Sequence, residues 1–222
     1  MQIFPTDQST LERSFLHIRR SPTQTQLEIA SIQTLALRQL YSLIIDDIRE
    51  RKSPYFEFFS LGQPVPTCAM PDRVRGLLTD LELSYSNPLL TWSLVRILEF
   101  KNSLIMTDRI SYSGNEAVEG IVMPLHPENL QLANLLDISR NGRVLEIGVG
   151  SGVNALIALN RGAREVVATD INPRAIKYSL INLAFNGLES SRVTFLLNSS
   201  DSPQNIFTPV AGCHFDHIIS NP

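Results

Sequence analysis

The chain has 222 residues, of which 43% are hydrophobic, and this is enough for a substantial core in one or two domains. Its formal net charge of −3 argues against a protein that holds nucleic acid through bulk positive charge. The two cysteines, Cys68 and Cys213, have no metal-binding or redox spacing, the N-terminus does not resemble a signal peptide, and no apolar run is long enough to span a membrane. We therefore expect a protein of the reducing cytoplasm that has no metal centre.

Residues 1–101 are predicted to form a small helical domain that recognises a substrate or partner. Apolar residues recur there with the three- and four-residue spacing of amphipathic helices, and prolines stand next to the expected helix ends. The helices are expected over residues 37–48, 74–81 and 90–98. Acidic and basic residues balance at eleven each in this region, so it does not look like an arm that binds nucleic acid.

Residues 102–126 are predicted to form a β-hairpin linker, because strand-like runs at 104–108 and 119–123 flank the turn-forming Ser113-Gly-Asn. A helix is expected to begin at Pro127, directly after His126. A single loop histidine is most often a structural hydrogen-bonding residue. Contact of His126 with a cofactor or substrate is the alternative.

Residues 127–222 alternate between strand-like and helix-like segments. Strands are expected over residues 143–147, 165–169, 192–197 and 215–220, and helices over residues 153–160 and 173–185. This alternation predicts a parallel sheet with right-handed crossovers, which is a Rossmann-like, doubly wound α/β fold. In such folds a ligand lies across the carboxyl ends of the strands, where the strand order reverses.

A glycine-rich turn follows the first of these strands, in the sequence Val144-Leu-Glu-Ile-Gly-Val-Gly-Ser-Gly152. Glycines have no Cβ atom, so a ligand can lie against the backbone and accept hydrogen bonds from the first turn of the next helix. Asp170 closes the second strand, where a carboxylate can accept hydrogen bonds from both ribose hydroxyls of a nucleoside. The dinucleotide-binding fingerprint requires a glycine at position 153, but this chain has Val153.

An acidic residue, Glu146, stands two positions before the G-x-G-x-G sequence, and this arrangement resembles motif I of class I S-adenosylmethionine-dependent methyltransferases. Two further blocks, Asp170-Ile-Asn-Pro-Arg-Ala-Ile and Asn182-Leu-Ala-Phe-Asn-Gly187, resemble the HemK-like or "methyltransferase small" group, whose fourth strand ends in Asn-Pro-Pro-Tyr or Asn-Pro-Pro-Phe. Asn221-Pro222 supplies the first two residues of that signature. The resemblance covers about the last 80 residues.

The resemblance implies S-adenosyl-L-methionine as the cofactor and assigns the site residues. The cofactor-binding set combines the glycine turn with the ends of the strands: Glu146, Gly148, Gly150, Gly152, Asp170, Ile171, Asn198 and Asp201. Near the adenine amino group, Ser199 has the expected position and Asp201 the expected chemistry, and we favour Asp201. Asn221 and Pro222 are the catalytic residues, because in the group their oxygens accept the two N–H hydrogens of a planar amine.

The implied function is methyl transfer to the nitrogen of a planar amide or amine in a macromolecule. A protein glutamine, in a release factor or a ribosomal protein, and a base of ribosomal RNA are both compatible with these residues. The alternative from a different class is a non-catalytic, methyltransferase-like module that binds cofactor or a partner protein. No membrane partner is expected.

The chain ends at Pro222, before the second proline and the aromatic residue of the signature and before the fifth to seventh strands of the fold. Four strands would leave an apolar strand at the edge of the sheet. We therefore expect that these 222 residues are part of a longer protein.

Overall fold

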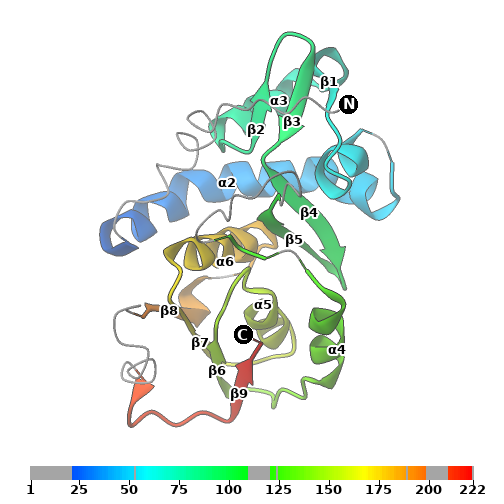
Figure 1. The fold of residues 1–222 in the computed structure, drawn as a ribbon. Coiled ribbons are helices and arrows are strands. Elements are labelled where there is room, and N and C mark those ends of the chain that lie inside the picture. Colours follow the sequence, from blue (N-terminus) through cyan, green and yellow to red (C-terminus); the bar gives the residue numbers. More distant parts are fainter. Residues whose placement is uncertain are drawn as a thin grey trace.

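The computed structural model describes residues 22–52, 54–109, 121–123, 125–188, 190–198 and 210–221. Within these ranges, no helix is both long enough and apolar enough to cross a membrane. In the described residues, two sheets and a hairpin are joined by helices, and the long helix α2 (Pro22–Arg49) lies between the two sheets (Figure 1).

The C-terminal part contains a four-stranded parallel sheet. Its strands are β6 (Arg143–Ile147), β7 (Glu165–Asp170), β8 (Val193–Leu197) and β9 (His217–Ser220). They lie in the order β8-β7-β6-β9, so the order reverses between β6 and β9. Val144 of β6 lies opposite Val166 of β7 and His217 of β9. The carboxyl ends of all four strands therefore meet at one edge, which is the ligand-binding edge of such sheets.

Three helices complete this α/β part: α4 (Pro127–Leu135), α5 (Val153–Asn160) and α6 (Pro173–Phe185). The predicted α5 and α6 are confirmed residue for residue. The side chain of Asn172 caps α6 by accepting a hydrogen bond from the N–H of Arg174 at 2.9 Å, and Pro173 stands at its first position. Gly187, with φ of +71°, follows the end of α6. Local capping chemistry thus fixes both ends of this helix.

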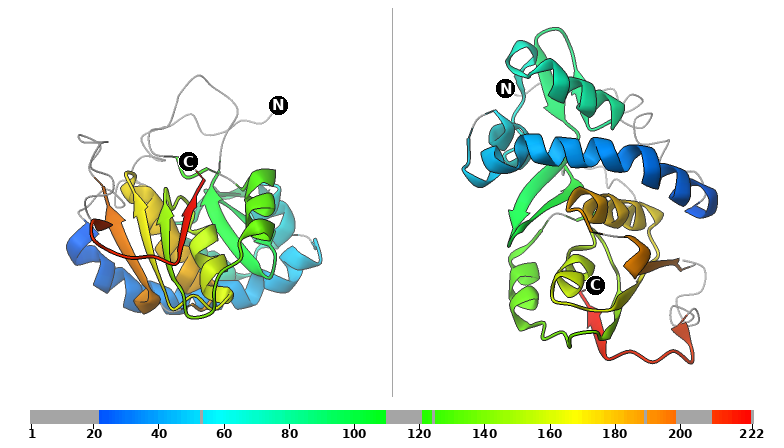
Figure 2. Two further views of the ribbon diagram at one scale, coloured as in Figure 1. Left: turned by 90° about the horizontal axis from the view of Figure 1, so that it is seen from below. Right: turned by 180° about the vertical axis from the view of Figure 1, so that it is seen from behind.

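The N-terminal part is built around one long helix. Its elements are α2 (Pro22–Arg49), η2 (Phe56–Ser60), β1 (Val65–Pro66), η3 (Thr67–Ala69), α3 (Asp72–Asp80), β2 (Ser84–Ser86) and β3 (Leu90–Ser93). The strands form a small antiparallel sheet in the order β1-β3-β2. Seen from both sides, α2 separates this sheet from the parallel sheet (Figures 1 and 2).

The apolar core passes without interruption from the N-terminal part into the α/β part. Leu40 and Ile44 of α2 belong to the same buried cluster as Val166 of β7 and Ile219 of β9. Within the same cluster, α2 contacts α6 through an edge-to-face pair between Tyr41 and Phe185, whose ring centroids are 5.2 Å apart. The helix therefore joins the two parts rather than lying on the surface.

The helix predicted over residues 90–98 is wrong, because these residues form β3 and most of β4 (Val95–Phe100). The apolar spacing of Leu90, Leu94 and Ile97 fits a helix, but Val95 and Ile97 also alternate as in a strand, and both are β-branched. Pairing with neighbouring strands decides between the two patterns. Trp92 accordingly lies on β3, beside Tyr85 of β2.

The predicted β-hairpin exists with a different partner strand. The run at 104–108 lies in β5 (Ser103–Asp108), but β5 pairs with β4 through a turn at Lys101–Asn102. Residues 121–123 have no strand structure, and Ser113-Gly-Asn lies outside the described residues. The pairing was missed because the segment before β5 was interpreted as a helix.

Candidate cofactor and substrate site

The glycine-rich turn connects β6 to α5 at the carboxyl edge of the sheet. Gly148, Gly150 and Gly152 have φ angles of +75°, +53° and +77°, a region that side chains disfavour. The N–H groups of Gly148 and Val149 donate hydrogen bonds to the carbonyl of Thr169, at 2.9 and 3.0 Å. A Cβ atom at Gly148 or Gly150 would meet nothing within 4 Å. The turn thus presents bare backbone toward open space, as a bound nucleoside requires.

Gly152 has a different role, because it packs against α6. A Cβ atom at this position would lie 2.8 Å from the side chain of Ser179 and 2.9 Å from its Cα atom. Ser179 also donates a hydrogen bond from Oγ to the carbonyl of Gly150, at 3.1 Å. The third glycine is therefore required by close packing between the turn and α6.

Gly152→Ala is expected to destabilise the protein by about 2–4 kcal/mol, since it adds left-handed backbone strain to a clash with α6. The measurement is the midpoint of chemical or thermal unfolding. The matched control is Gly76→Ala on α3, where a Cβ atom meets nothing and helix propensity favours alanine by about 0.5–1 kcal/mol. Equal stability of the two variants would contradict this packing role.

Asp170 lies at the end of β7, facing the glycine turn. Its Oδ2 atom accepts a hydrogen bond from the N–H of Gly150 at 2.9 Å, and its Oδ1 atom accepts one from the N–H of Asn172 at 2.8 Å. A carboxylate oxygen can accept two hydrogen bonds, so each oxygen retains capacity for one ribose hydroxyl. The two backbone donors therefore hold the carboxylate in a fixed orientation beside the turn.

The other predicted cofactor residues surround this carboxylate to different extents. Ile171 follows Asp170 and is 58% exposed, so its apolar side chain is available to a ligand. Asn198 directly follows β8, is buried, and donates its N–H to the carbonyl of Asp170 at 2.8 Å. Asp201 and its alternative, Ser199, lie outside the described residues, and the assignment to the adenine amino group stays a prediction.

Glu146 is buried in the middle of the sheet, with 1% of its surface exposed. Neither carboxylate oxygen lies in hydrogen-bonding geometry with another described residue. Burial raises the pKa of this carboxyl from 4.5 to about 8, while the nearby Asn154 side chain and Ala155 N–H favour the charged form and the charge of Asp170 opposes it. An unpaired carboxyl next to the glycine turn suits a cationic ligand group, such as an ammonium.

The raised pKa of Glu146 gives a pH dependence with a definite sign. Above pH 4.5 the unfolded chain releases the proton that the folded protein keeps until about pH 8, so stability should fall as pH rises through this window. Ligand binding should depend on pH in the opposite direction, because an ammonium bound beside Glu146 favours the ionised form of the Glu146 carboxyl. Affinity for S-adenosylhomocysteine should therefore rise with pH between about 6 and 7.5, by up to about tenfold per unit.

Calorimetric titrations in buffers of different ionisation enthalpy would measure both the affinity and the release of the proton. Glu146→Gln is the control, because it has a similar shape and does not titrate. The pH slope should be lost in this variant. A slope that persists in Glu146→Gln would assign the titration to another group.

Asn221 directly follows β9, the neighbour of β6. Ser220 lies opposite Ile147 in the parallel register, so Asn221 and Gly148 leave the ends of adjacent strands. Asn221 is exposed at this edge. The structure thus places the end of β9 beside the glycine turn, at the reversal of strand order, while Pro222 lies outside the described residues.

Comparison with known families supports the chemistry of this edge. Residues 129–221 match the family model "Ribosomal protein L11 methyltransferase (PrmA)". These residues form a class I S-adenosylmethionine-dependent methyltransferase domain. S-adenosylmethionine is accordingly the cofactor of the methyltransferase domain. Three features of the site fit this cofactor. The carboxyl of Glu146 suits the ammonium group, the oriented carboxylate of Asp170 suits the ribose, and the open backbone at Gly148 leaves room for the rest of the molecule.

Two curated relatives overlap with the methyltransferase domain. A protein of Methanocaldococcus jannaschii, assigned by inference as a protein N5-glutamine methyltransferase, is 37% identical over 113 residues, which are 47% of this chain and 52% of the relative. The ribosomal protein L11 methyltransferase of Geobacter sulfurreducens is 44% identical over 70 residues, which are 31% of this chain and 23% of the relative. The chain thus spans about half or less of the length of these relatives.

Solved structures give weaker matches. The ribosomal protein L11 methylase of Lactobacillus delbrueckii subsp. bulgaricus is 28% identical, covers 44% of this chain and 47% of its own, and has a TM-score of 0.36. TrmK of M. capricolum, solved with S-adenosylhomocysteine, is 19% identical, covers 44% of this chain and 41% of its own, and has a TM-score of 0.35. The family assignment therefore rests on the sequence matches.

Several residues around the site were not identified from the sequence. Ser179 and Asn182 of α6 contact the glycine turn, and Arg174 and Tyr178 of the same helix bind Asp108 of β5. Four-residue spacing of polar positions on α6 marks Arg174, Tyr178 and Asn182, since such positions share one helix face, whereas no such spacing marks Ser179. Among the described residues, no group of three or more His, Cys, Asp or Glu side chains is arranged to hold a metal.

Proposed function

We propose that the protein transfers a methyl group from S-adenosylmethionine to the nitrogen of a planar amide in a macromolecule, and that a protein glutamine is the acceptor. The observation that carries this proposal is the position of Asn221, beside the glycine turn at the reversal of strand order. An acceptor held by Asn221 would lie close to the cofactor.

When bound, S-adenosylmethionine supplies a methyl group on a sulfonium, whose leaving group is neutral and needs no acid catalyst. Asp170 and Glu146 hold the ribose and the amino-acid end. The Oδ1 atom of Asn221 and the carbonyl of Pro222 accept the two N–H hydrogens of the acceptor. These bonds aim the nitrogen lone pair and offset its weak nucleophilicity through positioning.

The relatives support a protein acceptor over RNA. Their names describe methyltransferases of ribosomal protein L11 and of protein glutamine. The balanced charge of residues 1–101 agrees with this, since an RNA-binding arm would carry excess positive charge. Membership in the group with the complete Asn-Pro-Pro-Tyr signature is part of the proposal.

Incubation with labelled S-adenosylmethionine and either ribosomal protein L11, a release factor or ribosomal RNA tests the proposal, followed by mass spectrometry of the product. Methylation of a glutamine nitrogen in a protein is the expected result. Label found only in RNA would replace the acceptor with a base. Cofactor binding without transfer to any of these would favour a non-catalytic module.

A further inference from the structure

One face of α6 carries polar residues at every fourth position, Arg174, Tyr178 and Asn182, and the C-cap residue Asn186 continues this stripe. This row of residues lies along β5 and contacts every second residue of the strand, namely the backbone of Leu104, the backbone of Met106 and the side chain of Asp108. Four helical residues rise by about 6 Å and two strand residues by about 6.6 Å, so helix and strand stay in step over this length. The helix α6 thus lies beside the free edge of β5, where a further strand would otherwise pair.

The two asparagines pair with the β5 backbone as another strand would. The Oδ1 atom of Asn186 accepts from the N–H of Leu104 at 3.0 Å, and its Nδ2 atom donates to the carbonyl of the same residue at 2.8 Å. Asn182 makes the same pair of bonds with Met106, both at 2.8 Å. The backbone edge of β5 is thereby satisfied by side chains.

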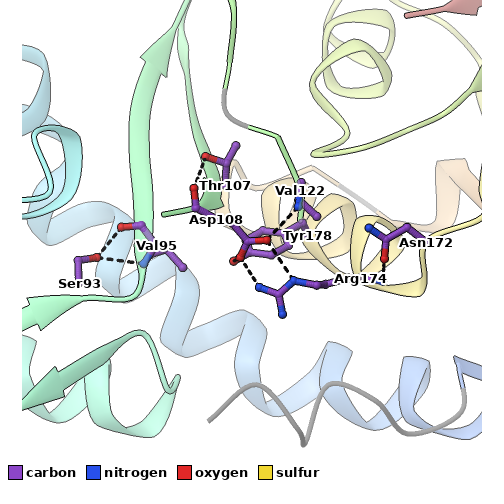
Figure 3. A network of polar contacts seen from close by, with 8 residues as sticks. All are labelled: Ser93, Val95, Thr107, Asp108, Val122, Asn172, Arg174 and Tyr178. Carbon is purple, nitrogen blue, oxygen red and sulfur yellow. Dashed lines mark hydrogen bonds and ion pairs between the residues drawn. The ribbon is translucent and has the colours of Figure 1, made fainter. Parts of the chain in front are cut away.

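Asp108 closes this contact at the end of β5 (Figure 3). Its two oxygens accept hydrogen bonds from Arg174, from the hydroxyl of Tyr178 at 2.6 Å, and from the N–H of Val122 at 2.9 Å. Burial of Tyr178 raises its pKa well above the usual value, and the charge of Asp108 and the hydrogen bond to it act in the same direction. The hairpin is thus held at three successive levels of α6.

Asn182 differs from Asn186 in one contact. Its Nδ2 atom also donates to the carbonyl of Ser151 in the glycine turn at 2.8 Å, whereas the corresponding atom of Asn186 donates to the carbonyl of Asn182. Asn182 is fully buried, so water cannot replace a lost bond. One side chain therefore joins the hairpin, α6 and the glycine turn.

We propose that Asn182 is a positioning residue for the cofactor site, because its side chain fixes the glycine turn against the docked hairpin. The inference rests on the proposed cofactor site. By this inference, the hairpin β4–β5 helps to shape the cofactor site. The N-terminal sheet, which continues into the hairpin, does so as well. Asn186 docks the hairpin without contacting the turn.

The test compares Asn182→Ala with Asn186→Ala, because each change removes three hydrogen bonds of similar length. Both should lower the unfolding midpoint, and Asn182→Ala should lower it more, because Asn186 is only half-buried and water can replace part of its lost bonds. Calorimetric titration with S-adenosylhomocysteine should show a dissociation constant raised about tenfold or more in Asn182→Ala, and less than about threefold in Asn186→Ala. Equal weakening in both variants, or none in Asn182→Ala, would overturn the inference.

Hydrogen–deuterium exchange without cofactor provides a second measurement. The peptide covering residues 147–153 should exchange faster in Asn182→Ala than in wild type or Asn186→Ala. If wild type fails to bind S-adenosylhomocysteine, the proposed function fails. Faster exchange in Asn182→Ala would still support the contact between Asn182 and the glycine turn. An unchanged exchange rate in a folded Asn182→Ala variant would overturn that link.

Discussion

Asp170→Ala is expected to weaken the binding of S-adenosylhomocysteine by about 100-fold or more. The carboxylate accepts hydrogen bonds from the N–H groups of Gly150 and Asn172, and we expect its remaining capacity to receive the ribose hydroxyls. Hydrogen bonds to a charged group contribute about 1.5–3 kcal/mol each, so losing two to the ligand costs roughly 3–6 kcal/mol. Calorimetric titration of the variant against wild type measures the change in dissociation constant.

The control for this change is Asp80→Ala, which removes an exposed carboxylate on α3. Its affinity for the cofactor product should equal that of wild type. Circular dichroism would establish that Asp170→Ala keeps its fold despite the loss of two backbone contacts. A folded Asp170→Ala variant that binds within about threefold of wild type would show that the ribose lies elsewhere.

Asn221→Ala is expected to lower the rate of methyl transfer by about 100- to 1,000-fold, the range seen when one group that orients a reacting centre is removed. Affinity for S-adenosylhomocysteine should change by less than about twofold, because Asn221 leaves β9 and is not part of the glycine turn. Single-turnover transfer and calorimetry on the same preparation separate these two quantities.

The matched control is Asn160→Ala, which removes an exposed carboxamide at the last residue of α5. It should transfer methyl groups at the wild-type rate. Wild-type transfer by Asn221→Ala would mean that the acceptor nitrogen is held by other residues. Weakened cofactor binding in this variant would place Asn221 in the cofactor site instead.

The α/β part could be predicted because its signals are local. The glycine turn, Asn172-Pro173 at the start of α6 and Gly187 after its end each act within a few residues, and the predicted helices agree with the structure. The position of Asp170 beside Gly150 followed from the shared edge of parallel strands.

The parts that could not be predicted depend on contacts distant in sequence. The spacing of Leu90, Leu94 and Ile97 suits a helix, and only the pairing of β3 with β1 and β2 and of β4 with β5 selects strands. Asn186 lies in the block Asn182-Leu-Ala-Phe-Asn-Gly187, but nothing in that block shows that its side chain binds Leu104, 82 residues earlier. No local pattern carries that information.

The unbroken core between α2 and the parallel sheet has a consequence for how the protein would select its acceptor. With Leu40 and Ile219 in one cluster, the described residues of the N-terminal part share a core with the parallel sheet, and this shared core opposes independent movement of the two parts. Unfolding should follow a single cooperative transition, and selection would rest on a shape that exists before the acceptor arrives. Such a preformed template discriminates through rigidity and spends little binding energy on closure.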